Sequence, residues 1–234
     1  LGTDQSEDVL VFEEKDETFG CGVFKSKSKK YIMTVSYHTL STEYSYIDAD
    51  KPDNKWTLIQ PREKDLLYDV DHFGDNFYIR TNLNATNFKL VKTPISKTTK
   101  ENWVDVIPHR DTVLFQGFDI FQNYLVLSER IKGLTAIRVK KWGGDEYYLE
   151  FNDPAYLANT TSNIDFNTDI LRYNYSSLTT PSSTFEINMD TKEQKLLKQD
   201  EVIDPNFVPD NYSSERLFAT ANDSSHPQHG FYPG

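Results

Sequence analysis

The chain has 234 residues, of which 37% are hydrophobic and 26% charged, and its formal net charge at pH 7 is −11. A chain of this length can bury a sizeable core, and all-β assemblies of this size often form one domain. The acidic balance argues against nucleic-acid binding, because neutralising phosphates requires concentrated Lys and Arg. Two interpretations stay open: a solvated surface, or a field that attracts cationic ligands.

The first β-rich runs lie near the beginning of the chain. Residues 9–12 (VLVF) are predicted to be the last strand of a sheet whose beginning is missing, and residues 19–23 (FGCGV) a strand interior that buries Cys21. A single cysteine excludes an internal disulfide and fits a reducing compartment, so we expect a cytoplasmic protein. No signal peptide or apolar span is visible, and because the chain begins with Leu1 we expect a fragment of a longer protein.

A repeat organises the chain from residue 31 onward. With Ile32, Phe77, Leu125 and Leu171 taken as equivalent positions, the steps are 45, 48 and 46 residues. A period of this length is typical of stacked copies of one unit. Each copy continues with two further β-rich runs, residues 42–50 and 55–61, 87–94 and 102–109, 135–142 and 146–151, and 183–190 and 194–199. A fourth run is clear in two of the intervals, at residues 66–73 and 113–121.

These runs predict an all-β fold. Aromatic residues make up 14% of the chain and cluster with Val, Ile and Thr in short runs bounded by turn formers, while no long window has helical spacing. Turns are predicted at residues 73–76 (FGDN), 142–145 (WGGD) and 189–194 (MDTKEQ). Four short strands every 45 or so residues describe a propeller blade. We therefore expect a partial β-propeller of about four four-stranded blades.

Candidate catalytic and metal-binding patterns are weak. None of the five histidines belongs to an HExxH motif, and neither a GxSxG elbow nor a phosphate-binding glycine loop occurs. Asp69, Asp71 and His72 resemble a metal cluster, but alternation places the two carboxylates on one solvated strand face. Residues 48–53 begin like a calcium loop yet contain Pro52 and lack the closing Glu, so we predict a turn. We assign no catalytic residue, no metal ligand and no cofactor, and the substrate-binding residues stay unknown.

Three long stretches resemble the propeller of the prolyl oligopeptidase family, most closely its oligopeptidase B (protease II) branch. They are residues 61–82, 117–135 and 171–202, and NDPAY at 152–156 fits as well. The resemblance implies a serine peptidase in which a seven-bladed propeller precedes and caps an α/β-hydrolase domain with Ser, Asp and His. None of the family's catalytic positions exists in this chain.

The resemblance also implies domain boundaries and partners. Residues 1–204 would be the later part of the propeller, and residues 205–223 an exit segment in which residues 216–220 (RLFAT) cross toward the hydrolase domain. Residues 224–234 match nothing expected. The implied partners are that missing domain and short peptides, cleaved after Lys or Arg in the oligopeptidase B branch and after Pro in the prolyl branch, with no nucleic acid or membrane. Folded proteins would be excluded by size.

Two other functions stay open for this chain. A stand-alone propeller could act as a protein-binding scaffold. A carbohydrate-active propeller would carry carboxylates at corresponding inner-strand positions, but those candidates are mixed: Thr34, Arg80, Ser128 and Tyr173.

The terminal faces of the repeat array are predicted to be apolar and to favour self-association, through residues 9–12, Val23, Ile170, Tyr173, Phe185 and Ile187.

Overall fold

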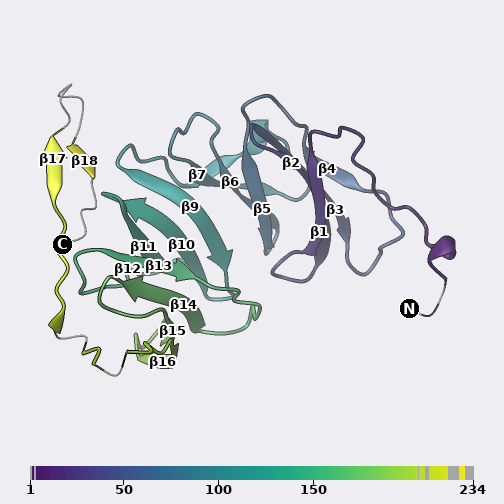
Figure 1. Ribbon diagram of the computed structural model, residues 1–234. Coiled ribbons are helices and arrows are strands. Elements are labelled where there is room, and N and C mark those ends of the chain that lie inside the picture. Colours follow the sequence, from purple (N-terminus) through teal and green to yellow (C-terminus); the bar gives the residue numbers. More distant parts are fainter. Residues whose placement is uncertain (1, 3, 205, 209–210, 221–226, 230–234) are drawn as a thin grey trace. The chain divides into compact units, whose positions relative to one another are not determined.

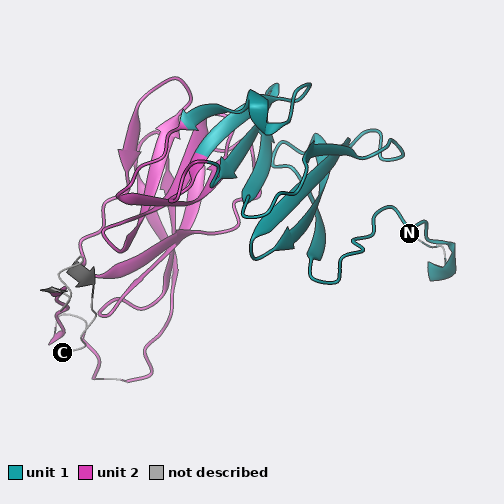
Figure 2. Cartoon of the chain, turned by 90° about the horizontal axis from the view of Figure 1, so that it is seen from above, with its two compact units in different colours: residues 1–83, 90–106 teal, residues 84–89, 107–234 magenta. Residues whose placement is uncertain are grey.

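The computed structural model describes residues 2, 4–204, 206–208, 211–220 and 227–229. The chain divides into two compact units, residues 1–83 with 90–106 and residues 84–89 with 107–234 (Figure 2). Within the described ranges the helices are short 3₁₀ turns, η1 (Gln5–Glu7) and η2 (Lys100–Asn102). None of the described helices is long and apolar enough to span a membrane.

Four four-stranded antiparallel sheets follow one another along the chain, and within each sheet the strands lie in chain order (Figure 1). The first sheet of the first unit contains β1 (Gly20–Lys25), β2 (Tyr31–His38), β3 (Ser41–Asp48) and β4 (Thr57–Gln60). Its second sheet contains β5 (Tyr68–Phe73), β6 (Asn76–Thr81), β7 (Lys89–Pro94) and β8 (Val104–Ile107). One end residue of β7 and one of β8 belong to the second unit. The second unit contains β9 (Val113–Ile120), β10 (Tyr124–Ile131), β11 (Leu134–Lys141) and β12 (Glu146–Tyr148), then β13 (Tyr156–Thr160), β14 (Ile170–Ser177), β15 (Ser183–Asn188) and β16 (Gln194–Gln199). A separate pair is formed by β17 (Phe218–Thr220) and β18 (Pro227–His229).

The predicted repeat is confirmed at the level of single residues. Each of the four equivalent positions is the second residue of the second strand of its sheet, in β2, β6, β10 and β14. The predicted turns lie between β5 and β6, β11 and β12, and β15 and β16. In the first two, Gly74 (φ 61°) and Gly143 (φ 68°) occupy the left-handed region that glycine adopts without a steric penalty.

Two predictions for the beginning of the chain are wrong. Residues 9–12 form no strand, and the first sheet begins at β1. Cys21 lies on β1 and is exposed rather than buried. Cys21 is exposed because β1 is an edge strand of its sheet, and no described element fully covers the side chains of this strand.

The core of the first unit joins its two sheets. Met33, Tyr44 and Ile59 of the first sheet pack against Tyr68 and Phe77 of the second, together with other aliphatic side chains. Neither sheet could bury this face alone, so the pair is the stable unit.

Tyr68 satisfies polar groups inside that core. Its hydroxyl donates to the carbonyl oxygen of Gln60 and accepts from the backbone N–H of Tyr44 at 2.9 Å. The backbone N–H of Tyr68 donates to Thr42 Oγ1 at 2.8 Å, and the Thr42 hydroxyl donates to the backbone carbonyl oxygen of Tyr68 at 2.8 Å. The aromatic ring thus fills the core while its polar end connects β4, β3 and β5.

The core of the second unit joins the third and fourth sheets in the same way. Phe121, Val126 and Val139 meet Leu171 and Tyr173, among others. Tyr173 and Ile187 are buried in this core and Phe185 packs against it, so the prediction that they form an exposed terminal face is wrong. The opposite face of the fourth sheet is polar: Arg172 pairs with Glu186 at 2.6 Å, and Thr184 donates to Asn174 at 3.0 Å.

The first sheet is partly covered by the segment before β1. Glu14 pairs with Arg62 at 2.6 Å, and Trp56 Nε1 donates to the carbonyl of Val11 at 3.0 Å. The hydrogen bond from Arg62 is the main reason that the pKa of Glu14 is lowered to about 2. Val9, Val11 and Val23 nevertheless stay exposed, as expected for this end of the stack.

Tyr68→Phe tests the polar role of this tyrosine. The variant keeps the ring but leaves the Gln60 carbonyl and the Tyr44 N–H without their partner, so we expect a loss of about 1–3 kcal/mol in unfolding free energy. Urea unfolding monitored by circular dichroism measures it. Tyr37→Phe removes an exposed hydroxyl and should change stability by under about 0.5 kcal/mol; equal losses in the two variants would contradict the assignment.

Candidate functional site

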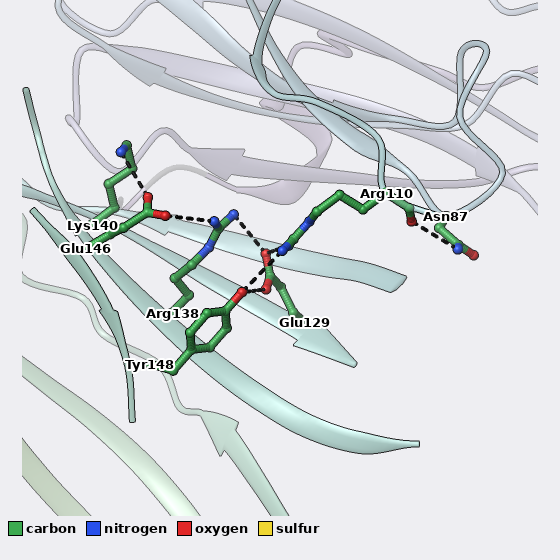
Figure 3. A network of polar contacts seen from close by, with 7 residues as sticks. All are labelled: Asn87, Arg110, Glu129, Arg138, Lys140, Glu146 and Tyr148. Carbon is green, nitrogen blue, oxygen red and sulfur yellow. Dashed lines mark hydrogen bonds and ion pairs between the residues drawn. The ribbon is translucent and has the colours of Figure 1, made fainter. Parts of the chain in front are cut away.

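The most concentrated polar cluster is a charged network on the third sheet (Figure 3). Glu129 on β10 is 1% exposed, and both of its carboxylate oxygens are engaged. Arg110, from the loop before β9, donates to Oε1, and the Tyr148 hydroxyl on β12 donates to Oε2 at 2.8 Å. Arg138 on β11 places Nη2 3.0 Å from Oε1. One buried carboxylate therefore connects a loop with β10, β11 and β12.

Strand register explains why these side chains meet. Arg138 lies directly opposite Tyr148, and Glu129 lies opposite Ala136, two residues from Arg138 on the same face. Neighbours with this diagonal spacing are within reach of long side chains. The network continues along β11 and β12, where Glu146 accepts from Arg138 at 3.2 Å and from Lys140 at 3.0 Å.

The loop that supplies Arg110 is held in place by Asn87. The Asn87 side-chain amide donates to the carbonyl oxygens of Arg110 at 3.2 Å and Asp111 at 2.7 Å, and its backbone N–H donates to His109 Nε2 at 3.1 Å. In return, the Phe115 N–H donates to the Asn87 carbonyl at 2.9 Å. The guanidinium of Arg110 is thus delivered to Glu129 from a fixed backbone.

The electrostatics of the network favour fixed charges. The network contains three cationic side chains, Arg110, Arg138 and Lys140. It contains two carboxylates, Glu129 and Glu146, so positive charges outnumber negative charges by one. The hydrogen bond from Lys140 is the main cause that lowers the pKa of Glu146, and burial raises the pKa of Tyr148. No nucleophile lies in the cluster, and its carboxylates are held by cations, so the arrangement suits positioning of strands rather than acid–base chemistry.

A second polar cluster surrounds Asp153 in the loop before β13. The hydroxyl of Tyr175 donates to its carboxylate, and the hydroxyls of Thr179 and Thr180 approach it at 3.4 and 3.3 Å. Burial acts to raise the pKa of Asp153, but hydrogen bonds from Tyr175, Ser177 and the two threonines outweigh it and lower the pKa. The cluster fixes the β14–β15 loop, where Ser177 Oγ also accepts from the Thr180 N–H at 2.9 Å.

The residues considered as metal ligands are used otherwise. Asp69 and Asp71 do lie on one face of β5, as alternation predicts. Asp69 pairs with Arg80 at 2.8 Å, and Asp71 accepts from the Lys27 N–H at 2.9 Å. His72 points the other way and is buried, with Nδ1 2.7 Å from Ser28 Oγ, and burial lowers its pKa. In the part of the chain that is described, no group of three or more His, Cys, Asp or Glu residues could hold a metal ion.

The remaining candidates fall on ordinary structural positions. Residues 48–53 form the turn between β3 and β4, as predicted, with the Asp50 N–H donating to Asp48 Oδ1 at 2.9 Å. The mixed inner-strand candidates lie on second strands: Thr34 on β2, Arg80 on β6, Ser128 on β10 and Tyr173 on β14. Sequence reasoning missed the Glu129 network, although the alternation of Leu125, Leu127 and Glu129 along one predicted strand face places a charge in an apolar row.

Comparisons with known proteins identify the fold. The profile described as "Prolyl oligopeptidase, N-terminal beta-propeller domain" matches residues 1–200. The chain belongs to the prolyl oligopeptidase family. The four sheets are therefore blades of a β-propeller, and the expected fold class is confirmed.

Individual relatives agree with this assignment. Dipeptidyl aminopeptidase BI of Pseudoxanthomonas mexicana is 40% identical over 95% of this chain, and Protease 2 of Moraxella lacunata is 32% identical over 94%. The alignment covers 31% of each relative, so this prolyl oligopeptidase propeller chain spans about a third of their length.

Solved structures of oligopeptidase B also match this chain. Oligopeptidase B from Leishmania major matches with a TM-score of 0.87 and 28% identity, over 96% of this chain and 33% of that one. The closed form of oligopeptidase B from Trypanosoma brucei with covalently bound antipain matches with a TM-score of 0.87 and 30% identity, over 95% and 33%. The relatives and structures named above are about three times as long as this chain, so none of them is a stand-alone propeller of this size.

Glu129→Gln tests the buried network. The substitution leaves two guanidinium groups around a neutral amide, so we expect the unfolding free energy to fall by about 3 kcal/mol. This value lies at the lower end of the range for a broken buried ion pair, because Arg110 is partly exposed. Glu186→Gln breaks the more exposed pair with Arg172 and should cost less than about 1 kcal/mol. Urea unfolding midpoints compare the two; a Glu129→Gln midpoint at or above that of Glu186→Gln would refute the role.

Asp153→Asn tests the second cluster. Its pKa is lower in the folded chain than the ordinary 3.8, so the ionised group stabilises the loop above pH 3.8, and this stabilisation is lost as the pH falls further. Hydrogen exchange at the Thr179 and Thr180 amides, corrected for the intrinsic rate, should therefore be constant at pH values well above 3.8 in the wild type. It should be faster throughout that range in Asp153→Asn, and unchanged protection would show that Asp153 does not hold the loop.

Proposed function

We propose that this chain is the gating propeller of a serine oligopeptidase that cleaves short peptides after Lys or Arg and excludes folded proteins by size. The observation that carries the proposal is the propeller match over residues 1–200 within relatives about three times longer. The proposed organisation keeps residues 1–204 as propeller and residues 205–223 as the connection to the catalytic domain. The tail at 224–234 falls mostly outside the described residues.

Size selection follows from enclosure. A catalytic serine enclosed between a propeller and a hydrolase domain can be reached by a flexible peptide, whereas a folded domain must first unfold at a cost of several kcal/mol. Such selection requires a rigid wall more than a recognition residue. The buried network around Glu129 and the cluster around Asp153 provide rigidity of this kind in the second unit.

The preference for basic residues rests on relatives and on charge. Protease 2 and the oligopeptidase B structures are the relatives that favour this branch. A net charge of −11 would raise the local concentration of cationic peptides, an effect that salt screens. The pocket that selects the side chain is proposed to lie in the catalytic domain.

A second activity is favoured by one specific observation. The relative with 40% identity bears the name dipeptidyl aminopeptidase BI, which describes removal of dipeptides from a free amino terminus. The same propeller would then enclose an exopeptidase. The two activities differ in whether the substrate needs a free α-amino group.

The full-length enzyme distinguishes these activities. We expect a fluorophosphonate probe to label one serine outside residues 1–234, and the enzyme to hydrolyse an amino-blocked Arg-amide substrate but not a folded protein with exposed lysines. Hydrolysis confined to X-Arg-amides with a free amino group would instead establish the dipeptidyl activity. A matched Pro-amide substrate controls for the prolyl branch, and serine labelling within residues 1–234 would overturn the proposal.

A further inference from the structure

A pocket of about 360 Å³ opens on the second unit beside the tip of the β10–β11 hairpin. Its walls include Tyr156 and Leu157 of β13, Leu178 of the β14–β15 loop, and Arg130 of β10. Leu157 is 48% exposed and Leu178 is 66% exposed. Exposed leucines around a concave apolar site mark a surface that another group covers.

The hairpin tip beside this pocket is a two-residue turn with unusual backbone geometry. Lys132 (φ 49°) and Gly133 (φ 84°) both adopt positive φ, as a type I′ turn requires. Each of their carbonyl oxygens accepts from an arginine. Arg130 Nη1 donates to Gly133 at 2.8 Å, and Arg216 Nη2 donates to Lys132.

Arg216 belongs to the segment that follows the last blade. Its guanidinium lies 4.9 Å from the ring centroid of Phe218, at the start of β17. The Arg216 contact therefore fastens the connecting segment to the hairpin tip, next to the pocket. Leu217 and Phe218, the next residues in the chain, are also largely exposed.

The strand register shows that the chain leaves the last blade at the same end as the pocket. Gln199, the last residue of β16, lies opposite Ser183, which lies opposite Tyr175 of β14. On the other side, Tyr156 at the start of β13 lies opposite Ser177. The end of β16, the β14–β15 loop and the pocket wall therefore share one end of this sheet.

We propose that this pocket receives an apolar side chain of the catalytic domain, and that Arg216 holds the connecting segment so that this domain meets the pocket. The inference rests on the proposed enclosure between two domains. Relatives three times as long supply the occupant, and the connection at the pocket's edge makes the contact intramolecular. A tether raises the effective concentration of the domain to the millimolar range, so one small apolar contact is enough to bias closure.

Leu178→Asp in the full-length enzyme tests the docking. Because Leu178 is exposed within the propeller, the charge should leave the blade folded and act on the interface. We expect the ratio of closed to open enzyme to fall about tenfold, as the loss of one buried leucine implies. Limited proteolysis of the connecting segment follows the open population and should accelerate by up to about tenfold, and the radius of gyration should increase.

Leu197→Asp is the matched control, because this leucine is 40% exposed on β16 and does not line the pocket. It should leave both readouts unchanged. Leu178→Ala and Arg216→Ala should shift proteolysis in the same direction as Leu178→Asp by smaller factors.

The alternatives give different results. If Leu178→Asp raises KM only for long peptides while proteolysis and radius stay unchanged, the pocket binds substrate and the docking proposal is wrong. If it converts a dimer to a monomer by light scattering without exposing the connecting segment, the occupant is a second copy and the proposal is again wrong. If the wild type lacks peptidase activity but the variant still opens, the proposed function fails and the docking stands.

Discussion

The structure depends on burying one apolar sheet face against the next sheet. A four-stranded blade of 20 to 30 strand residues cannot enclose its own hydrophobic side chains, so each unit consists of two blades with a shared core. Phe77 in one unit and Leu171 in the other are fully buried in these cores. Period and packing therefore have the same cause, since within each unit the two copies of the repeat present matching faces to one another.

Several polar groups inside the blades are satisfied by contacts between strands and between sheets. Tyr68 supplies a hydroxyl to the backbone of the first sheet, and Thr135 Oγ1 accepts from the Ala158 N–H of the fourth sheet at 2.7 Å. Glu129 serves the same purpose with charges. Buried polar groups of this kind cost free energy unless they are paired, so they select one arrangement of strands over others.

The proposed gating role requires strands and loops that are held in place. In the described part of the chain, ion pairs and hydroxyl clusters such as Asp153 with Tyr175 hold loops and strands. In the proposed gating role, a rigid wall would admit flexible peptides through its shape. The proposed docking at the apolar pocket beside the β10–β11 hairpin would join this wall to a catalytic domain at the end of the sheet from which the chain departs.

Most of the strands, the period and the family can be predicted from the amino-acid sequence alone, because they depend on local alternation and on the spacing between copies. The sequence identified the equivalent position at Leu125 and the turn at Gly74 without tertiary information. Which strand face is buried in the first and last sheets depends on tertiary contacts: Cys21 lies on an open edge, and Tyr173 points into the core. Alternation defines two faces but not which of them meets a neighbour, and the meeting of Arg110 with Glu129 likewise requires a loop and a strand that only the fold brings together.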